Sequence, residues 1–431
     1  MKPFFASFFL IFSFLAFSQV EDSEINQLRE EVSVLRYTEL VNSMTQRSLL
    51  IPGYFAEKKG LVARQAYNFW KRNQNEQLVS HLNVYKALHE AYKYLSIDSV
   101  NRKFYHEIIG HTEAVVSLKF GVEPNVFYSA GSDGKVLQWN TEQLAAPPLT
   151  LFESNQLIKS IDISPDGSFL MVVTKDKGIA FISLNDNLSS EVRSKVVDNE
   201  VVQAAAFLPE KSQYVLINKQ GEVKIKGYEI TERKIDETTE KVFSLIVHPT
   251  NDFIYGGTES GSLISWDKVN TTQRYFEGRF SVNSLAISKD LKTLAIGREK
   301  GDVWLWDIPN DTLSRVISGH QSAITDLDFS VDDKLLLTAS RDGTARVWET
   351  ENPRKLPILL DDHNDWVLTA TFDSNGEYIY TGSKDSFIRS WPLNPEVIAE
   401  NICQTLSRQF TLDEWNDYVG DLPFEKTCEK P

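Results

Sequence analysis

A short pattern of tight turn and strand recurs seven times along this chain of 431 residues. In each copy a polar turn is followed by a strand that alternates apolar and polar residues, which is typical of half-buried β-structure. The turn position is held by Gly134, Gly178, Gly221, Gly261, Gly301, Gly343 and Ser386, at intervals of 40 to 44 residues. A period of about 42 residues with four short strands in each unit indicates a seven-bladed β-propeller. We therefore expect a mainly β fold whose blades cover one another's faces.

The sequence also predicts how the ring closes. Residues 104–111 (FYHEIIGH) have the same form as residues 315–320 (RVISGH), which read as the outer strand of one blade leading into the next. No blade precedes residues 104–111, and the seventh blade supplies only three strands of its own up to Trp391. We expect the early segment to pair with the seventh blade, because a closed ring leaves no open sheet edge.

One repeat carries a recognisable set of polar side chains. Gly319 and His320 are followed by Thr338, Asp342 and Trp348, and this stretch resembles the WD40 repeat. The resemblance implies that the last four side chains form a hydrogen-bonded chain within the blade, since a buried carboxylate needs donors. Equivalent sets are His111, Ser129, Asp133 and Trp139 in blade one, and His363, Thr381, Asp385 and Trp391 in blade seven. Blades two to five lack the Gly-His pair, and we expect them to depend on apolar packing and backbone ladders alone.

The N-terminus predicts export. Lys2 is followed by an apolar run over residues 4–17 and by small residues at Ala16 and Ser18, as in a cleaved secretory signal peptide over residues 1–18. The run is short for a hydrocarbon core about 30 Å thick. We expect cleavage near Ser18, a periplasmic or surface location and only indirect membrane association. If the segment is retained, the chain would instead be a membrane-tethered sensor subunit.

Residues 19–100 predict a helical module. Ile25, Leu28, Val32 and Leu35 form a narrow apolar seam with a 3-4-3 spacing, which fades further along. Two more helices are expected over residues 61–72 and 81–95. This module resembles the helical segment that precedes the propeller in bacterial signalling proteins of the STAND class. Because no GxxxxGK[ST] phosphate loop occurs in the chain, neither nucleotide binding nor nucleotide hydrolysis is expected.

The propeller is expected over residues 101–393 and a helical tail over residues 394–431. Pro395 starts one predicted helix, and Thr411 and Glu414 form a capping box before another. The ending resembles those of WD40 proteins of the same class. Cys403 and Cys428 are the two cysteines of the chain, and an exported protein is expected to join them in a disulfide. We expect the tail to clamp against the ring.

Composition and motifs argue against several functions. A formal net charge of −15 disfavours binding to nucleic acid, whose phosphates need clustered cations. The chain has no HExxH, GxSxG or Cys-His arrangement, and its recurrent turn aspartates belong to different blades. We therefore expect no catalysis, no metal and no cofactor.

What remains is binding to proteins. The WD40 resemblance implies that partners meet the ring where chains enter the innermost strands and just before the turn aspartates. The candidates on which we place most weight are Val116, Phe243, Arg341, Trp366, Leu368 and Lys384. Exposed Trp and Arg dominate interface hot spots, although Trp366 could instead pack on the closing strand. We expect a protein–protein interaction scaffold of the bacterial cell envelope that binds envelope-complex components. The alternative is a ligand-binding or enzymatic propeller that uses its central channel, which converging carboxylates or histidines at the channel mouth would favour.

Overall fold

The computed structural model describes residues 26–27, 31–73, 81–97, 105–176, 178–184, 194–198, 200–209, 213–227, 232–250, 253–267, 272–276 and 278–429. The chain divides into two compact units, Tyr105–Leu393 and a second unit made of Met1–Phe104 with Asn394–Pro431. The predicted signal peptide, residues 1–18, lies outside the described residues. Among the helices that the structure describes, none combines the length and apolar character needed to cross a bilayer.

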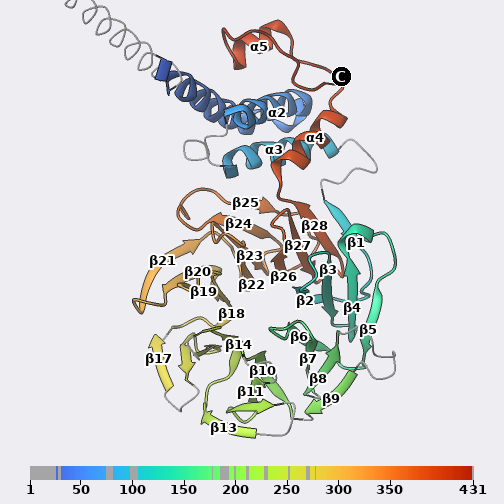
Figure 1. Ribbon diagram of the computed structural model, residues 1–431, viewed down its shortest axis with the longest axis vertical. Helices are drawn as coiled ribbons and strands as arrows, with labels where there is room; N and C mark the ends of the chain where they lie inside the picture. Colours follow the sequence, from blue (N-terminus) through green and yellow to red (C-terminus); the bar gives the residue numbers. More distant parts are fainter. Residues whose placement is uncertain are drawn as a thin grey trace, which may run out of the picture. The chain divides into compact units, whose positions relative to one another are not determined.

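The larger unit is a ring of seven four-stranded antiparallel sheets (Figure 1), which confirms the predicted mainly β, seven-bladed propeller. Blade one contains β2 (Val115–Phe120), β3 (Val126–Gly131), β4 (Lys135–Asn140) and β5 (Leu149–Glu153). A short 3-10 helix, η2 (Thr141–Gln143), follows β4. Blade two contains β6 (Ile158–Ile163), β7 (Phe169–Thr174), β8 (Ile179–Ser183) and β9 (Ser194–Asp198). Blade three contains β10 (Val202–Phe207), β11 (Gln213–Asn218), β12 (Glu222–Gly227) and β13 (Glu232–Glu237).

The remaining blades follow the same order from the axis outwards. Blade four contains β14 (Val242–Val247), β15 (Ile254–Thr258), β16 (Leu263–Trp266) and β17 (Thr272–Phe276). Blade five contains β18 (Val282–Ile287), β19 (Thr293–Arg298), β20 (Asp302–Asp307) and β21 (Thr312–Ser318). Blade six contains β22 (Ile324–Phe329), β23 (Leu335–Ser340), β24 (Ala345–Glu349) and β25 (Ile358–Leu360). Blade seven contains β26 (Val367–Phe372), β27 (Tyr378–Ser383) and β28 (Ile388–Pro392).

The fourth strand of blade seven comes from the start of the ring. Strand β1 (His106–Ile108) pairs antiparallel with β28, with Glu107 opposite Arg389 and Ile108 opposite Ile388. This pairing confirms the predicted closure. Two segments about 280 residues apart in the sequence thus complete one four-stranded sheet, in which β1 is the outer strand beside β28.

The turn between the second and third strand of each blade needs a left-handed backbone. Six blades place a glycine there, with φ between 79° and 93°, and blade seven places Ser386 there with φ of 73°. Gly134 and Gly221 could not be replaced without a shift, because an added Cβ would lie about 2 Å from the backbone oxygens of Ser154 and Thr238. The glycine that recurs in the sequence therefore marks the position in each blade where the backbone is left-handed.

Replacing Ser386 by glycine is expected to stabilise the propeller. A left-handed conformation costs an L-residue about 1 kcal/mol, and we expect Ser386→Gly to raise the free energy of unfolding by about 0.5–1 kcal/mol. The matched reverse change is Gly343→Ser, because Gly343 has φ of 83° and its added Cβ would meet only Asp365 O at 3.7 Å. Urea denaturation of both variants measures the effect; equal signs for the two changes would contradict it.

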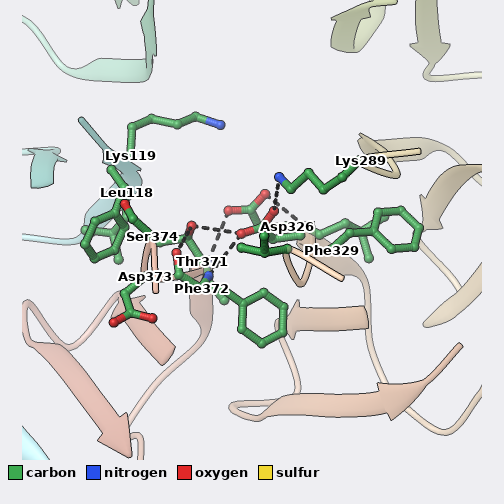
Figure 2. A pocket seen from close by; sticks show the side chains of 14 residues that line it. Leu118, Lys119, Lys289, Asp326, Phe329, Thr371, Phe372, Asp373 and Ser374 are labelled. Atoms are coloured by element: carbon green, nitrogen blue, oxygen red, sulfur yellow. Dashed lines mark hydrogen bonds and ion pairs between the residues drawn. The ribbon is translucent and has the colours of Figure 1, made fainter. Parts of the chain in front are cut away.

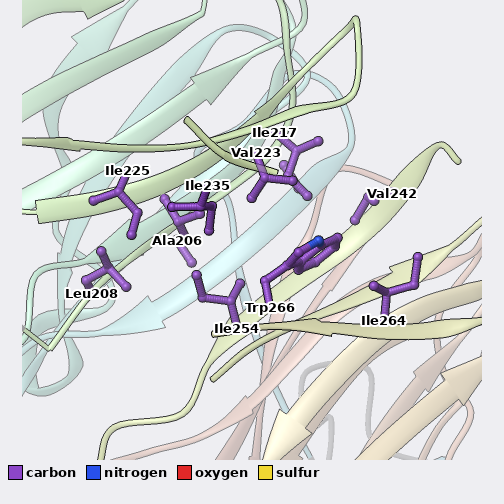
Figure 3. Packing of buried hydrophobic residues seen from close by; sticks show 12 residues of the cluster. Ala206, Leu208, Ile217, Val223, Ile225, Ile235, Val242, Ile254, Ile264 and Trp266 are labelled. Carbon is purple, nitrogen blue, oxygen red and sulfur yellow. The ribbon is translucent and has the colours of Figure 1, made fainter. Parts of the chain in front are cut away.

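Adjacent blades share apolar clusters. Between blades three and four, Trp266 of β16 is 2% exposed and lies among buried residues of both blades, including Ile225 and Ile235 (Figure 3). Similar clusters join blades one and two, and blades five and six. Since each blade covers its neighbour's face, the core of this unit is distributed around the ring rather than centred in one place.

The second unit is helical. It contains a helix over residues 31–50, η1 (Gly53–Phe55), α2 (Ala56–Asn73), α3 (His81–Ile97), α4 (Pro395–Thr405) and α5 (Leu412–Tyr418). The buried ammonium of Lys59 donates to the carbonyls of Leu49 and Ile51, at 3.2 and 3.1 Å, and so satisfies the end of the first helix. The capping box expected at Thr411 and Glu414 starts α5.

The tail belongs to this helical unit. Gln65 of α2 donates to Glu425 at 2.5 Å and Asn68 donates to Thr427 O at 2.9 Å, so the tail is not the separate unit that we predicted. Cys403 and Cys428 form a disulfide, and Arg64 Nε donates to Cys403 Sγ at 3.2 Å. The polar face of α2 thus holds the tail, a contact that neither segment's own pattern could show.

Candidate functional site

The polar chain expected in blade one is present. The indole N–H of Trp139 donates to Ser129 Oγ at 2.8 Å, and Ser129 Oγ lies 2.7 Å from His111 Nε2. The Nδ1 of His111 lies 3.1 Å from both oxygens of Asp133, which also accepts from the backbone of Thr112 and Lys135. If His111 is neutral, its Nδ1–H donates to Asp133 and its Nε2 accepts from the Ser129 hydroxyl. Each of the four side chains then has a hydrogen-bond partner. All of these groups are engaged within the blade.

Blade six repeats this geometry. Trp348 Nε1 donates to Thr338 Oγ1 at 3.0 Å, His320 Nε2 lies 2.7 Å from the same oxygen, and His320 Nδ1 lies 2.8 Å from Asp342. Burial opposes ionisation of Asp342, but His320, Thr344 and the backbone of Gln321 outweigh it and hold its pKa far below the ordinary value. A carboxylate held this way stabilises the turn and is not available for acid–base chemistry.

Blade seven departs from the pattern. His363 Nε2 lies 2.8 Å from Thr381 Oγ1, which accepts from Trp391 Nε1 at 2.9 Å, but the described residues give no hydrogen bond between His363 and Asp385. Asp385 instead faces the guanidinium of Arg389, with its oxygens 3.2 and 2.9 Å from the two terminal nitrogens. Our prediction of a complete chain in this blade was wrong at that link, because a buried arginine takes the carboxylate.

Arg389 also reaches the closing strand. Its side chain is fully buried, its Nη2 lies 3.6 Å from Glu107 of β1, and its Cζ lies 5.6 Å from the ring centre of Tyr105. Burial opposes ionisation of Asp385, but Arg389 and the N–H groups of Asn364 and Phe387 hold its pKa below the ordinary value. One cation thus joins the seventh blade's turn to the strand that closes the ring.

We predicted that blades two to five depend on apolar packing and backbone ladders alone. For blades three and five this prediction was wrong. In blade five, Asp302 accepts from Arg298 at 3.0 Å and from the indole of Trp304 at 2.9 Å. In blade three, Lys224 has a side chain only 10% exposed and lies 3.0 Å from each of three glutamates, Glu200, Glu222 and Glu232. Blades three and five each use a polar group of their own, and the repeat motif could not reveal these groups.

Acid is expected to destabilise blade seven through His363. Burial lowers the pKa of His363 to about 3, against about 6.5 in an unfolded chain. The neutral form is therefore favoured in the folded state, and this stability is present above about pH 6.5 and is lost as pH falls towards 3. We expect His363→Gln to destabilise the protein by on the order of 2 kcal/mol at pH 7 and by much less at pH 4. Urea denaturation at both pH values tests this, with exposed His106→Gln as the control; a constant difference would contradict it.

Carboxylates do gather on the innermost strands of the ring, where the alternative function would need them. Asp326 of β22 accepts from Thr369 Oγ1 at 2.7 Å and from the backbone of Ala370 at 3.1 Å, both in the next blade. Asp328 accepts from the backbone of Phe372 at 3.0 Å, and Asp162 of β6 accepts from Phe207 N in the same way at 3.0 Å. These aspartates therefore join neighbouring innermost strands through backbone N–H groups.

Two lysines lie near these aspartates. A pocket of about 290 Å³ is lined by Lys119, Lys289, Asp326 and Asp328, and Figure 2 shows the two lysines on opposite sides of it. The surrounding protein opposes the charge of Lys119, but Asp162, Asp326 and Asp328 outweigh this and hold its pKa above the ordinary value. Among the described residues, no group of three His, Cys, Asp or Glu side chains is arranged to hold a metal. The aspartates are thus engaged by neighbouring strands, and Lys289 lies 3.8 Å from Asp328.

The strongest candidate for binding lies on the upper face, which we define as the face carrying the starts of the innermost strands. There Trp366 is 40% exposed, with Arg341 Cζ 5.1 Å and Lys384 Nζ 4.4 Å from its ring centre. Lys384 also pairs with Asp365 at 3.2 Å. Both ring contacts of Trp366 in the described residues are to these cations rather than to β1. We call Arg341, Trp366 and Lys384 the Trp366 patch.

The other candidates are dispersed. Leu368 is half-buried two residues from Trp366, whereas half-buried Val116 packs into the cluster between blades one and two. Phe243 lies on blade four, 38% exposed beside Lys241. A similar aromatic and cation group, Phe280 with Lys300 at 5.9 Å, was missed because Phe280 lies in the loop before β18.

Three stretches of the chain match the family model described as WD domain, G-beta repeat: residues 102–140, 311–349 and 354–392. The chain carries WD40 repeats. The matched stretches are those that contain the three Trp–Ser/Thr–His sets described above. The matched blades therefore meet around the point where the ring closes, and the four blades without a match include blades three and five with their individual polar groups.

The relatives are eukaryotic WD-repeat proteins that match in part. The chain is 35% identical over 136 residues to Jouberin of Rattus norvegicus, covering 31% of this chain and 12% of that protein. It is 35% identical over 133 residues to Protein LST8 homolog of Drosophila melanogaster, covering 29% of this chain and 42% of that protein. It is 23% identical over 288 residues to the 66 kDa stress protein of Physarum polycephalum, covering 66% of this chain and 40% of that protein. The chain thus spans about an eighth of the first of these relatives.

Proposed function

We propose that this chain is a non-catalytic scaffold that binds other proteins through the upper face of its propeller. The observation that carries the proposal is the Trp366 patch, where a large aromatic ring remains exposed between two cations. Such groups supply much of the affinity in protein interfaces, because they combine apolar area with directed charge. The patch fits a partner segment that places carboxylates beside an apolar or aromatic side chain.

Site-directed crosslinking tests this location. Leu368, next to the patch, is replaced by the photoreactive residue p-benzoylphenylalanine, and the same replacement is made at Phe243 on blade four as the matched control. We expect illumination of cells to give a discrete crosslinked protein from position 368 and not from position 243. Equal capture at the two positions, or none at position 368, would argue against the patch as the binding site.

We further propose that the protein works in a bacterial cell envelope, after export and cleavage near Ser18. The basic start, the apolar run and the small residues of positions 1–18 support export, and a disulfide between Cys403 and Cys428 suits an oxidising compartment. The bacterial origin, the kinship with STAND-class proteins and the envelope partners rest on sequence patterns alone. Intact mass of the purified protein tests export: loss of about 18 residues is expected, and retention would favour the tethered sensor subunit.

A further inference from the structure

Each blade presents one side chain at the same place on the upper face. The residue lies in the turn between the second and third strand, and its backbone N–H donates to the carbonyl of the residue just before the innermost strand. In blade six, Arg341 N lies 3.0 Å from Ala323 O. All seven blades repeat this bond, at 2.8 to 3.0 Å. The seven side chains therefore occupy equivalent positions around the upper face.

The charges at these equivalent positions are sorted around the ring. Blades six, seven, two and three carry the exposed cations Arg341, Lys384, Lys175 and Lys219, and blade one, which lies between blades seven and two, carries uncharged Ser132. We call these four cations the basic arc. The whole chain has a formal net charge of −15, so four cations over five consecutive blades depart from its overall charge.

Blades four and five carry exposed glutamates at the same positions, and these glutamates are bonded locally. Glu259 Oε1 lies 3.3 Å from Lys241 Nζ, and Glu299 Oε2 accepts from Ser281 Oγ at 3.2 Å. Each of these bonds stays within one blade. The glutamates of blades four and five are therefore satisfied by the protein itself and offer little to a charged ligand.

The cations of the basic arc are less engaged. Within the described residues, the side chains of Lys175 and Lys219 form neither a hydrogen bond nor an ion pair. In the same part of the chain, Arg341 contacts only the indole of the Trp366 patch. Lys384 has a carboxylate partner, Asp365, at 3.2 Å. Three of the four cations thus keep N–H donors that a ligand can use.

Acidic side chains near the basic arc leave this surplus of cations in place. Glu200 lies 3.0 Å from Lys224. Burial lowers the pKa of Lys159 and Asp176 counteracts this effect, so Asp176 acts on a cation of its own blade. Glu113 of blade one is exposed and forms no ion pair within the described residues. One free acid beside three available cations leaves the arc attractive to negative charge.

We propose that the basic arc extends the binding site of the Trp366 patch, and that the partner is a protein segment rich in Asp and Glu. The segment places an apolar side chain against Trp366 and directs its carboxylates over blade one to Lys175 and Lys219. This inference rests on the proposed function, because the Trp366 patch holds one end of the segment. Charge complementarity of this kind selects between partners and speeds their association.

Fluorescence anisotropy with a defined probe tests the inference. The probe is a labelled peptide of alternating Asp and Glu around one central Phe, and the protein is the full chain. We expect Lys175→Glu with Lys219→Glu to weaken binding at least tenfold. Raising the ionic strength from about 0.05 to 0.3 M should also weaken binding to the wild type, because salt screens exposed charges.

The matched control is Lys241→Glu with Lys300→Glu. It makes the same change of charge at exposed lysines on the upper face of blades four and five, and its affinity should stay within threefold of wild type. Because all four lysines are exposed, both double variants should unfold at the same urea concentration as wild type. Equal losses of affinity in the two double variants would overturn the inference, since binding would then follow net charge alone.

The remaining outcomes separate this inference from the proposed function. If Trp366→Ala weakens binding of the peptide but Lys175→Glu with Lys219→Glu does not, the basic arc is wrong and the Trp366 patch stands. A wild-type chain that does not bind the peptide, or that binds single-stranded DNA of the same charge equally well, would overturn an acidic protein segment as the ligand. Photocrosslinking from position 368 would still test the patch in either case.

Discussion

Replacing Arg389 by alanine is expected to lower the free energy of unfolding by about 3–5 kcal/mol. The guanidinium is fully buried and lies 2.9 Å from Asp385 and 3.6 Å from Glu107 of the closing strand. Without it the Asp385 carboxylate keeps its buried position but loses its cation, and β1 loses its charged contact with β28. Urea denaturation followed by intrinsic tryptophan fluorescence measures the change.

Arg346 is the matched control, because it occupies the equivalent place in blade six. Its side chain is 16% exposed and 3.7 Å from Asp342, whose oxygens are already held by His320 and by backbone N–H groups. We expect Arg346→Ala to cost less than about 1 kcal/mol, as for partly exposed pairs. If the two alanine variants are equally destabilised, Arg389 has no special part in closing the ring.

The second large effect is expected on binding. Trp366→Ala combined with Lys384→Glu should weaken binding of the partner captured at position 368 by about 30- to 700-fold, which corresponds to the 2–4 kcal/mol typical of a hot spot. The physical reason is that one change removes the exposed ring and the other opposes an acidic partner segment. Isothermal titration calorimetry with the purified partner measures the loss.

The matched control for this prediction is Phe243→Ala with Lys241→Glu. That pair has the same composition of aromatic ring and lysine, with 4.8 Å from Lys241 Nζ to the ring centre, but lies on blade four. We expect its affinity for the partner to stay within threefold of wild type. Both double variants should unfold at the same urea concentration as wild type, because Trp366 and Phe243 are exposed. Equal losses of affinity would move the binding site away from blades six and seven.

Much of the fold was predictable, because the features that define it repeat. The turn positions from Gly134 to Ser386 share one backbone conformation, so the number of blades follows from a count of turns. The closing strand was also predictable, since residues 104–111 have the form of an outer strand and no earlier blade. The sets in blades one and six follow from residue types at fixed spacing.

What could not be predicted is carried by contacts that the repeat does not determine. Arg389 and Arg346 occupy the same place in their repeats, but Asp342 stays bonded to His320 whereas Asp385 is taken by Arg389, and residue type at that position does not distinguish the two outcomes. The packing of the tail on α2 could not be predicted, because the tail's pattern contains no information on the polar face of that helix. For the binding residues, a common position in the repeat gave no indication that Val116 is half-buried in a core cluster while Trp366 is 40% exposed.

Amide hydrogen exchange in β1 tests most directly whether seven blades form one closed ring. If His106–Ile108 complete blade seven through β28, their amides that pair with β28 should be protected to the same extent as the interior of β27, with exchange slowed by several orders of magnitude. In Arg389→Ala the protection of β1 should fall while that of β11 in blade three is retained. Exchange of β1 in the wild type at the rate of an unstructured peptide would contradict the closed ring.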